Sequence, residues 1–538
     1  MVNHYRKHRA VKIKKLWGTV GILVISCCYA SVMNAQQSNG KPSVQSKWVY
    51  IGADKTGNQA GKLIYKRTEK GDRIMDFSNA GYKGGGVALP QVPVKLRLAP
   101  VTGDNTAAIQ AAIDRVGQMP LVAGYRGAVL LAPGVFDCYS ALKISTSGVV
   151  LKGSGSINGK QGTVLQLKDK PHTAIEIRGQ VKVTPVGKAT KLEDSYLPAG
   201  ADYINVQSSA GLKTGDWIRI TKSVTPAWLH FMGMDHLTRN NKPQTWLSGA
   251  LTTERQIAAV TGNKLMLEVP LADSYDSQYL NPPGVTVERI QYTGELSDIG
   301  IEDLSIYAQE QSGTISQRHD KAFTLSGVKD AWVRNVRILN TVNSISVTGR
   351  RITLDHVSIE HALPTTGAAK PADINGSGTQ LLFNQCSIRG DNVFYFATGA
   401  RVTGPIVLLN CTFTGKGWIQ PHQRWATGIL IDGCKVPDGG IDFMNRGAYG
   451  SGHGWAVGWA VAWNCQAAGY LNQMPPGSAN WVIGSTGEKM YKPMPFDKSP
   501  DVPEGIYDAY ETPVAPKSLY LAQLKERLGA GALRNIGY

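Results

Sequence analysis

The segment between residues 418 and 459 concentrates the side chains that could do chemistry. His422, Arg424, Arg446 and His453 lie there among several tryptophans. A guanidinium group binds a carboxylate through paired hydrogen bonds, and an imidazole titrates near neutral pH and can accept a proton. We therefore predict these four residues as the catalytic residues of a site for an anionic substrate.

Polar residues also occur where three strand-like segments end. The sequences there are SIEHALP (358–364), SIRGDNVFYF (387–396) and TFTGKGW (412–418). If these segments are neighbouring strands, about 4.8 Å apart, their polar residues form a second basic column. The alternatives are ordinary turns ion-paired through Glu360 and Asp391, and tryptophans that belong to the core. The predicted substrate-binding residues are His361, Arg389, Asp391, Tyr395, Lys416, Trp418 and Trp425.

An irregular internal repeat must position these side chains. Short β-branched segments carry an Asp or Asn at spacings of 20 to 32 residues, without helices between them. Repeats of this length favour a solenoid in which each coil buries its apolar face against its neighbours. The prediction is an all-β fold, a right-handed parallel β-helix. The aligned residues, interpreted as a structural turn ladder, are Asp303, Asn335, Asp355, Asn384, Asn410, Asp432 and Asn464.

The ladder predicts that two arginines stack. Arg424 lies 14 residues past Asn410, and Arg446 lies 14 past Asp432. Stacked guanidinium groups repel one another unless an anion neutralises them, and a substrate carboxylate could do so.

Five cysteines lie beyond the N-terminal region, and four of them end strand-like segments. An odd number without a CxxC pair or a Cys/His cluster favours neither a disulfide framework nor a zinc site. We interpret the four as inward-facing residues of successive coils. The five are Cys138, Cys386, Cys411, Cys434 and Cys465.

The remaining elements divide the chain. Residues 103–117 have helical spacing and should cap the N-terminal end of the solenoid. Residues 180–290 break the repeat and contain a hairpin signal at Gly262-Asn263, which indicates an inserted small β-domain. Its segment 228–237, with His230 and His236, is either a packed loop or a wall over the solenoid. A short amphipathic helix at 518–529 should cover a flank or the far end.

The predicted divisions are a signal peptide (1–35), an N-terminal extension (36–100), the capping helix with the first coils (101–180), the insert (181–290), the main coils (291–470) and a C-terminal tail (471–538).

Charge and the N-terminus indicate an exported protein with an acidic partner. The net charge is +17, and +11 remains on residues 36–538 after the basic leader. The basic run Arg6 to Lys15 precedes an apolar stretch too short to span a bilayer, as in an export signal. Cleavage could follow Ala35, or Cys27 could carry a lipid anchor. We expect a periplasmic or secreted monomer with no nucleic-acid partner.

Several segments resemble the pectin-lyase-like superfamily of exported β-helix proteins. They are DFSNAGYKGGGVALP (76–90), DNTAAIQAAID (104–114), AVLLAPGVF (128–136) and the later coils. The resemblance implies action on polysaccharides, either as a lyase on uronic-acid chains or as a hydrolase of the polygalacturonase type. Fold alone does not separate these activities.

The residues favour elimination over hydrolysis. The Gly452-His453-Gly454 and Gly390-Asp391-Asn392 segments match the polygalacturonase pattern only in part, because an Asn-Thr-Asp is missing. Elimination needs a cation that neutralises the uronate carboxylate and a base near C5. Arg424, Arg446 and Arg389 suit the first role, His422 or His453 the second, and Tyr395 or Tyr449 could protonate the leaving oxygen.

We therefore expect a polysaccharide lyase that acts on an acidic glycan. A glycoside hydrolase and a non-catalytic glycan-binding protein are the alternatives. We expect no cofactor and no metal site. Calcium, which lyases of this fold commonly use, has only the scattered carboxylates Asp373, Asp391, Asp432 and Asp442 to hold it.

Overall fold

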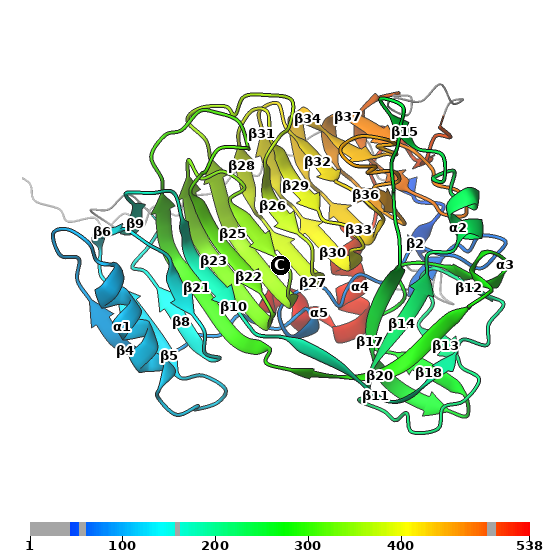
Figure 1. Cartoon of the computed structure of the whole chain (residues 1–538), viewed down its shortest axis with the longest axis horizontal. Helices are drawn as coiled ribbons and strands as arrows, with labels where there is room; N and C mark the ends of the chain where they lie inside the picture. The colour runs from blue at the N-terminus through cyan, green and yellow to red at the C-terminus, as the bar shows by residue number, and fades with distance from the viewer. Residues whose placement is uncertain (1–43, 53–60, 157–161, 492–501) are drawn as a thin grey trace, which may run out of the picture. The chain divides into compact units, whose positions relative to one another are not determined.

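The computed structural model describes residues 44–52, 61–156, 162–491 and 502–538. Most of the described strands join one continuous parallel sheet, which coils from β4 (Val94–Leu98) to β40 (Ile506–Asp508) (Figure 1). Each strand pairs with equivalent strands of the adjacent coils, as β25 (Arg350–Glu360) does with β23 (Val328–Leu339) and β27 (Thr379–Asn384). The predicted right-handed parallel β-helix, the fold that the superfamily resemblance implied, is confirmed.

One face of the solenoid carries the candidate site, and we call it the third sheet. Its strands pair in parallel from coil to coil and run side by side in Figure 1. Turns at both ends of each strand lead to the other two faces. The strands of the third sheet include β10 (Thr173–Arg178), β22 (Lys321–Ser326), β24 (Ile345–Val347), β26 (Ala372–Gly376), β29 (Phe394–Thr398), β32 (Trp418–Pro421) and β34 (Lys435–Phe443).

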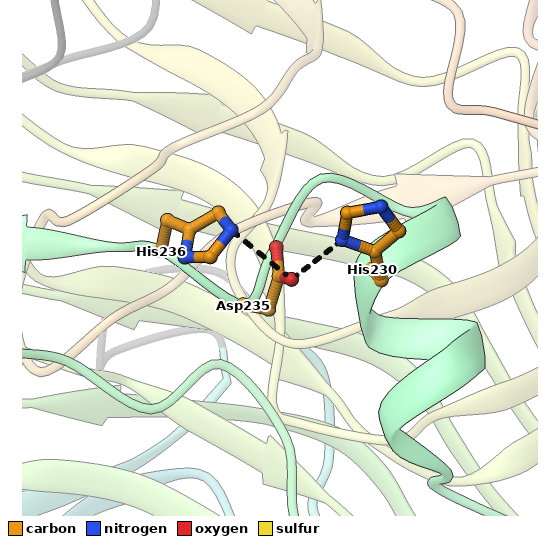
Figure 2. Close-up of side chains that lie close together, drawn as sticks. All are labelled: His230, Asp235 and His236. Atoms are coloured by element: carbon orange, nitrogen blue, oxygen red, sulfur yellow. Dashed lines mark hydrogen bonds and ion pairs between the residues drawn. The ribbon is translucent and has the colours of Figure 1, made fainter.

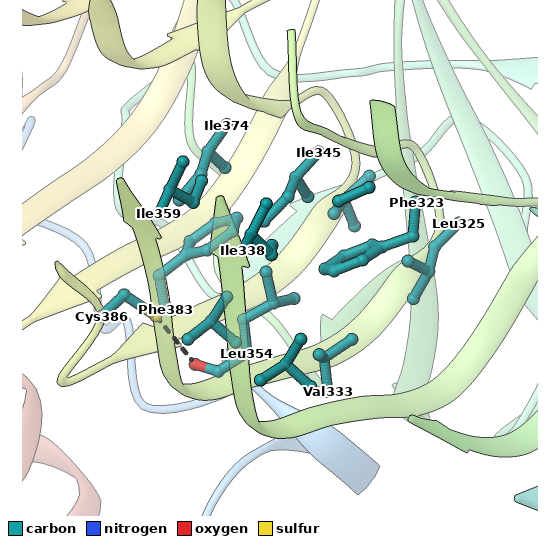
Figure 3. Packing of buried hydrophobic residues seen from close by; sticks show 14 of the residues in the cluster. Phe323, Leu325, Val333, Ile338, Ile345, Leu354, Ile359, Ile374, Phe383 and Cys386 are labelled. Atoms are coloured by element: carbon teal, nitrogen blue, oxygen red, sulfur yellow. Dashed lines mark hydrogen bonds between the residues drawn. The ribbon is translucent and has the colours of Figure 1, made fainter. Parts of the chain in front are cut away.

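The core fills the interior of the solenoid with stacked apolar side chains. In the third sheet, Phe323, Ile345, Ile374 and Phe396 occupy equivalent positions and are at most 1% exposed. Figure 3 shows several of these side chains packed against residues from the other faces. Successive residues of a strand point to opposite sides. The residues that alternate with these core residues along each strand therefore face outward.

The turn ladder is real, but its predicted alignment slips by one residue on three coils. Asn335, Asn410 and Asn464 have positive φ angles of 54°, 51° and 48°. Strand pairing aligns Arg334 with Asp355, so the residue equivalent to Asn335 is His356, whose φ is 51°. Gln385 and Gly433 likewise replace Asn384 and Asp432 at the turn position, with φ angles of 51° and 65°. A left-handed turn tolerates several residue types, which explains why polar identity alone misplaced the register.

All five cysteines of the described chain are free and buried. The Sγ atoms of Cys386, Cys411 and Cys434 lie near carbonyl oxygens of the preceding coil, at 3.5, 3.3 and 3.5 Å. They are a column of small apolar side chains inside the solenoid.

Helix α1 (Thr106–Gly117) covers the first coils and packs Ile109, Ile113 and Val116 into the solenoid core. Asp104 accepts a hydrogen bond from the Thr106 amide at 2.8 Å at the start of the helix. The helix therefore removes the open apolar end that a solenoid otherwise exposes.

The insert is an antiparallel sheet with its own core. Its strand order is β11-β20-β14-β17-β18-β13, and the β17–β18 hairpin turns at Gly262-Asn263 as expected. In Figure 1 its strands lie together beside the later coils. The bounds are β11 (Lys182–Lys191), β13 (Tyr203–Asn205), β14 (Trp217–Ser223), α2 (Pro226–Phe231), β17 (Ala250–Thr261), β18 (Lys264–Leu267) and β20 (Val285–Thr293).

The C-terminal helices α4 (Leu519–Leu528) and α5 (Ala530–Asn535) lie against the flank of the later coils. The start of α4 is fixed by Asp432, whose carboxylate accepts from Ser518 Oγ at 2.7 Å and from the Tyr520 amide at 2.8 Å. Tyr520, in turn, donates its hydroxyl to the carbonyl of Ala80 at 2.8 Å.

No helix in the described residues is long and apolar enough to cross a membrane. The proposed signal segment and Cys27 lie outside the described residues.

Candidate functional site

The outer face of the third sheet carries a polar column. Ser346, Asn375, Ala397 and Gln420 are in register on β24, β26, β29 and β32, and Asp442 is next to Gln420 on β34. Gln420 and Asp442 are 6% and 5% exposed although they face away from the solenoid core. Buried polar groups on an outer face require partners, and Gln420 Nε2 donates to the Asp442 carboxylate.

Arg446 and His422 are in direct contact at the end of this column. Arg446 Nη1 lies 2.6 Å from His422 Nδ1, 2.9 Å from Nε2 and 3.0 Å from the carbonyl oxygen of His422. A guanidinium only donates, so the ring nitrogen that it contacts must be unprotonated. Burial and the charge of Arg446 lower the pKa of His422 to about 3, which is consistent with a neutral ring.

His453 completes a cluster that we call the His–Arg cluster, made of His422, Arg446 and His453. The two imidazole rings are 4.9 Å apart, centroid to centroid. Burial and the charges of Arg446, Arg424 and Arg239 lower the pKa of His453 to about 4. Its Nδ1 makes no hydrogen bond within the described part of the chain. Both histidines are therefore neutral bases at neutral pH, held in a positive environment.

Burial also affects Arg446. Its pKa falls to about 10, mainly through desolvation, while Asp442 and Tyr449 act in the opposite direction. The guanidinium lies 5.6 Å from the centre of the Tyr449 ring. An aromatic face and a nearby carboxylate thus stabilise a cation in a half-buried position.

Arg424 does not stack on Arg446 as predicted. Its Nε and Nη2 donate to the carbonyls of Gly452 and Ser451 at 3.3 and 3.0 Å. Strand pairing aligns Ala426 with Val457, so the coil neighbour of Arg424 is Trp455. The slipped ladder, together with the loop at 447–454, accounts for the error.

The Gly452-His453-Gly454 segment is a close contact with the insert. Gly454 has a φ of 53°, and a Cβ there would collide with the indole of Trp246. Trp246 Nε1 donates to the carbonyl of Trp455 at 3.1 Å. The close approach of the insert thus explains the glycines at 452 and 454. His453 lies between the insert and the solenoid.

The second predicted column lies at the other ends of the third-sheet strands. Arg389 is exposed and ion-paired with Glu360 at 3.1 Å, and Asp391 accepts from the Lys416 amide at 2.6 Å. A strand of five residues separates these ends from the His–Arg cluster by about 17 Å. Arg389, Asp391 and Lys416 therefore line the opposite edge of the same face.

His361 lies inside the solenoid. It bonds Asp373 at 2.8 Å, and the two side chains are 5% and 0% exposed. The Asp373 carboxylate raises the pKa of His361 despite its burial. The pair is a structural contact between the residue after β25 and strand β26, and the structure does not place His361 on a substrate surface.

The aromatic residues also differ from expectation. A register irregularity between Phe394 and Phe396 turns Tyr395 inward, and Tyr395 is 0% exposed. Its hydroxyl accepts from the Gly417 amide at 3.0 Å. Tyr395 therefore does not reach a bound substrate.

The two tryptophans have different roles. Trp425 is 4% exposed and belongs to the core of the insert, where its Nε1 donates to Asp273 at 3.0 Å. Trp418 is half-buried on the third sheet, with its ring against Gly440. Trp418 thus remains available to stack on a ring of a ligand, and Trp425 does not.

A separate cleft lies where the insert meets the solenoid, and no residue of the His–Arg cluster lines it. It has a volume of about 320 Å³ and is lined by Thr252, Ser377, Thr379 and Arg401, among others. The Arg401 amide donates to the carbonyl of Arg424 at 2.8 Å, which joins one wall of the cleft to the coil that carries Arg424.

Carboxylates are scarce on this face. In the described polar column, Asp442 and Glu176 are the acids, and Glu176 lies six strands away, about 29 Å at the spacing of parallel strands. Asp373, Asp391 and Asp432 each bond a different partner. The acids considered for calcium are thus dispersed.

Sequence comparison identifies no relative of this protein. No protein-family model matches the sequence, and a search of the curated proteins finds no match.

Structural comparison finds distant similarities. One is the tailspike gp61 of Pseudomonas phage phi297, with 11% identity, 72% of this chain and 69% of that chain covered, and a TM-score of 0.34. Another is the A-module of the mannuronan C-5 epimerase AlgE6 of Azotobacter vinelandii, with 12% identity, coverage of 82% and 99%, and a TM-score of 0.29. The assignment of a parallel β-helix depends on the strand pairing described above.

Sequence reasoning did not single out Gln420, Phe394 or the insert segment around Trp246 for this site. The Phe394 ring is 5.1 Å from that of His422. Alternation along β32 could have indicated that Gln420 faces outward, but the contact with the insert has no local signal.

Proposed function

We propose that the protein is a polysaccharide lyase that cleaves a uronic-acid-containing glycan by β-elimination. The observation that supports this most is the His–Arg cluster, in which two neutral imidazoles lie beside a half-buried arginine. The outer face of the third sheet beside this cluster is polar, with Asn375, Gln420 and Asp442 in one column.

Arg446 would neutralise the uronate carboxylate. The C5 proton of a uronate becomes acidic enough to remove only when the adjacent carboxylate charge is compensated. A guanidinium donates two parallel hydrogen bonds to a carboxylate, and burial strengthens that interaction. The contact with His422 fixes the position of Arg446, so His422 is a positioning residue in this proposal.

His453 would be the base. One of its ring nitrogens takes the C5 proton, the electron pair forms the C4–C5 double bond, and the bond from C4 to the glycosidic oxygen breaks. His453 suits this role better than His422, because the ring of His422 is already engaged by Arg446. Tyr449, adjacent to Arg446, would donate a proton to the leaving oxygen.

A glycoside hydrolase is the second candidate. Hydrolysis generally requires two carboxyl groups within about 10 Å on either side of the glycosidic bond. Asp442 is a suitable acid, but the described polar column offers no second carboxylate within that range. The two glutamates that line the cleft, Glu254 and Glu295, are ion-paired with arginines. The residues of the site, two imidazoles and a guanidinium with one carboxylate, therefore favour elimination over hydrolysis.

A panel of anionic glycans tests the proposal. Elimination produces an unsaturated uronide, which is detected by its new ultraviolet absorbance. Reducing ends without that absorbance would support the hydrolase instead, and binding without any product would support a glycan-binding protein.

A histidine pair tests the assignment of the base. His453→Gln should lower kcat on the identified substrate by about 100-fold or more, the range expected for loss of a general base, without loss of the folded state. His172→Gln is a matched control, because His172 is also partly buried but lies at the start of β10. Near wild-type turnover in folded His453→Gln would overturn the assignment.

We also propose that the protein is exported, on the basis of the basic and apolar leader in residues 1–35. N-terminal sequencing and mass measurement of protein from the cell envelope test this. Retention of Met1 would contradict export, and a lipid on Cys27 would identify a lipoprotein.

A further inference from the structure

Three side chains in the insert converge on one point. His230 Nδ1 lies 2.8 Å from Asp235 Oδ2, and His236 Nε2 lies 3.3 Å from the same oxygen (Figure 2). The three potential ligand atoms are all within 4.8 Å of one another, and no other group of three His, Cys, Asp or Glu side chains in the described chain meets this condition.

The backbone holds these side chains outward. Trp228, Met232, Met234 and Leu237 from the same segment are at most 5% exposed and anchor it in the insert core. The turn after α2 is closed by the Met234 amide, which donates to the carbonyl of Leu229 at 2.9 Å. The anchors fix the segment, so the residues between them are left on its outer side.

The spacing suits a tetrahedral metal ion. Zinc binds nitrogen and oxygen ligands at about 2.0–2.2 Å, which places ligands about 3.3 Å from one another. The contact of His236 with Asp235 has that length, at 3.3 Å, and the contact of His230 is shorter, at 2.8 Å. Both histidine side chains are exposed, at 77% and 85%, so small rotations can complete the geometry.

We propose that His230, Asp235 and His236 form a zinc-binding site with an open fourth position. Two imidazoles and one carboxylate are typical zinc donors, whereas calcium and magnesium prefer oxygen ligands. An ion at this site would connect the end of α2 to the following loop.

The segment with the proposed zinc site contacts the loop that carries His453. Arg239, three residues past His236, donates to the carbonyl of Gly450 at 3.0 Å, and Trp455 Nε1 donates to the carbonyl of Met232 at 3.1 Å. The segment that would hold zinc therefore covers the loop that carries His453. Bound zinc would stabilise that cover.

Equilibrium dialysis of untagged, metal-free protein against Zn²⁺ tests the site. One zinc per chain is expected, with the dissociation constant raised about 10-fold or more in His230→Asn and in His236→Asn, since loss of even outer-shell partners has effects of that size. His356→Asn is the matched control, because His356 also pairs with an aspartate at 3.1 Å, on the solenoid.

A second measurement uses stability instead of affinity. Zn²⁺ should raise the Tm of the wild type and of His356→Asn in a concentration-dependent way, and should not raise that of the His230→Asn/His236→Asn double variant. Equal zinc binding by the wild type and the double variant, or no binding by the wild type, would overturn the proposal. All these readouts are independent of the proposed lyase activity.

Discussion

The two histidines of the His–Arg cluster have pKa values well below that of free imidazole, and the cause is burial followed by the charge of Arg446. This situation differs from a solvent-exposed histidine, which is half-protonated near pH 6.5. A neutral base is thus available far into the acid range, although its lower basicity makes each proton transfer more demanding.

The dependence of kcat/KM on pH should reflect the lowered pKa values of the His–Arg cluster. We expect kcat/KM on the identified substrate to stay level through pH 6.5 and to decline only near pH 4, where His453 becomes protonated. On the alkaline side, loss of the Arg446 charge should lower kcat/KM near pH 10. An acid limb centred at pH 6.5 would show that the base is an ordinary exposed imidazole.

The residues of the site were only partly predictable from the sequence. His422, Arg446 and His453 come together as expected, because His422 lies about one coil before Arg446 and His453, which share the next coil. Tyr395 was placed on the wrong side, because a single register irregularity reverses the direction of a side chain. Such an irregularity leaves no signal in the alternation of apolar residues.

At the scale of elements, the attachment of α4 depends on Asp432. Burial raises the pKa of Asp432 to about 7, above the value of about 3.9 in an unfolded chain. The unfolded chain therefore loses its proton first as the pH rises, and the contribution of Asp432 to stability is complete below pH 4 and lost as the pH passes 7.

Asp432→Asn should remove this dependence. An amide oxygen can still accept from Ser518 and from the Tyr520 amide, and it stays neutral at all pH values. Relative to the wild type, the Tm of the variant should rise as the pH increases from 5 to 8.

Asp432→Ala provides the comparison, because it removes the acceptor and should cost about 1–3 kcal/mol of stability at both pH values. The same pH dependence in the wild type and in Asp432→Asn would refute the role of Asp432.

The elements themselves were the most predictable part. The helices at 106–117 and 519–528 and the hairpin at Gly262-Asn263 follow from local spacing and capping residues. The exact register of the coils did not follow, since several residue types occupy the left-handed turn position.

At the scale of the whole described molecule, two tryptophans have different expected roles. Trp425 stabilises the packing of the insert on the solenoid, and Trp418 contacts the ligand. Trp425 contacts Trp228 and Trp246 of the insert, with ring centroids 6.1 and 6.0 Å away. Trp425→Ala should therefore destabilise the protein by about 3–5 kcal/mol.

Trp418→Ala should leave Tm almost unchanged and raise KM on the identified substrate. Thermal unfolding and steady-state kinetics of both variants check this contrast. A large loss of Tm in Trp418→Ala would place that residue in the core instead.

The insert and the C-terminal helix each join parts of the solenoid that are distant along the chain. The insert leaves the sheet between β10 and β21 (Leu296–Tyr307), yet it packs against Trp425 and Trp455 several coils later. Helix α4 connects Asp432 to the segment near Ala80. A plain solenoid has contacts only between adjacent coils, so its coils can separate one after another. Here the insert and α4 contact coils that are not adjacent, so the loss of any one coil destabilises the others. Urea should therefore unfold the described parts of the chain in a single cooperative transition, with tryptophan fluorescence and circular dichroism changing together.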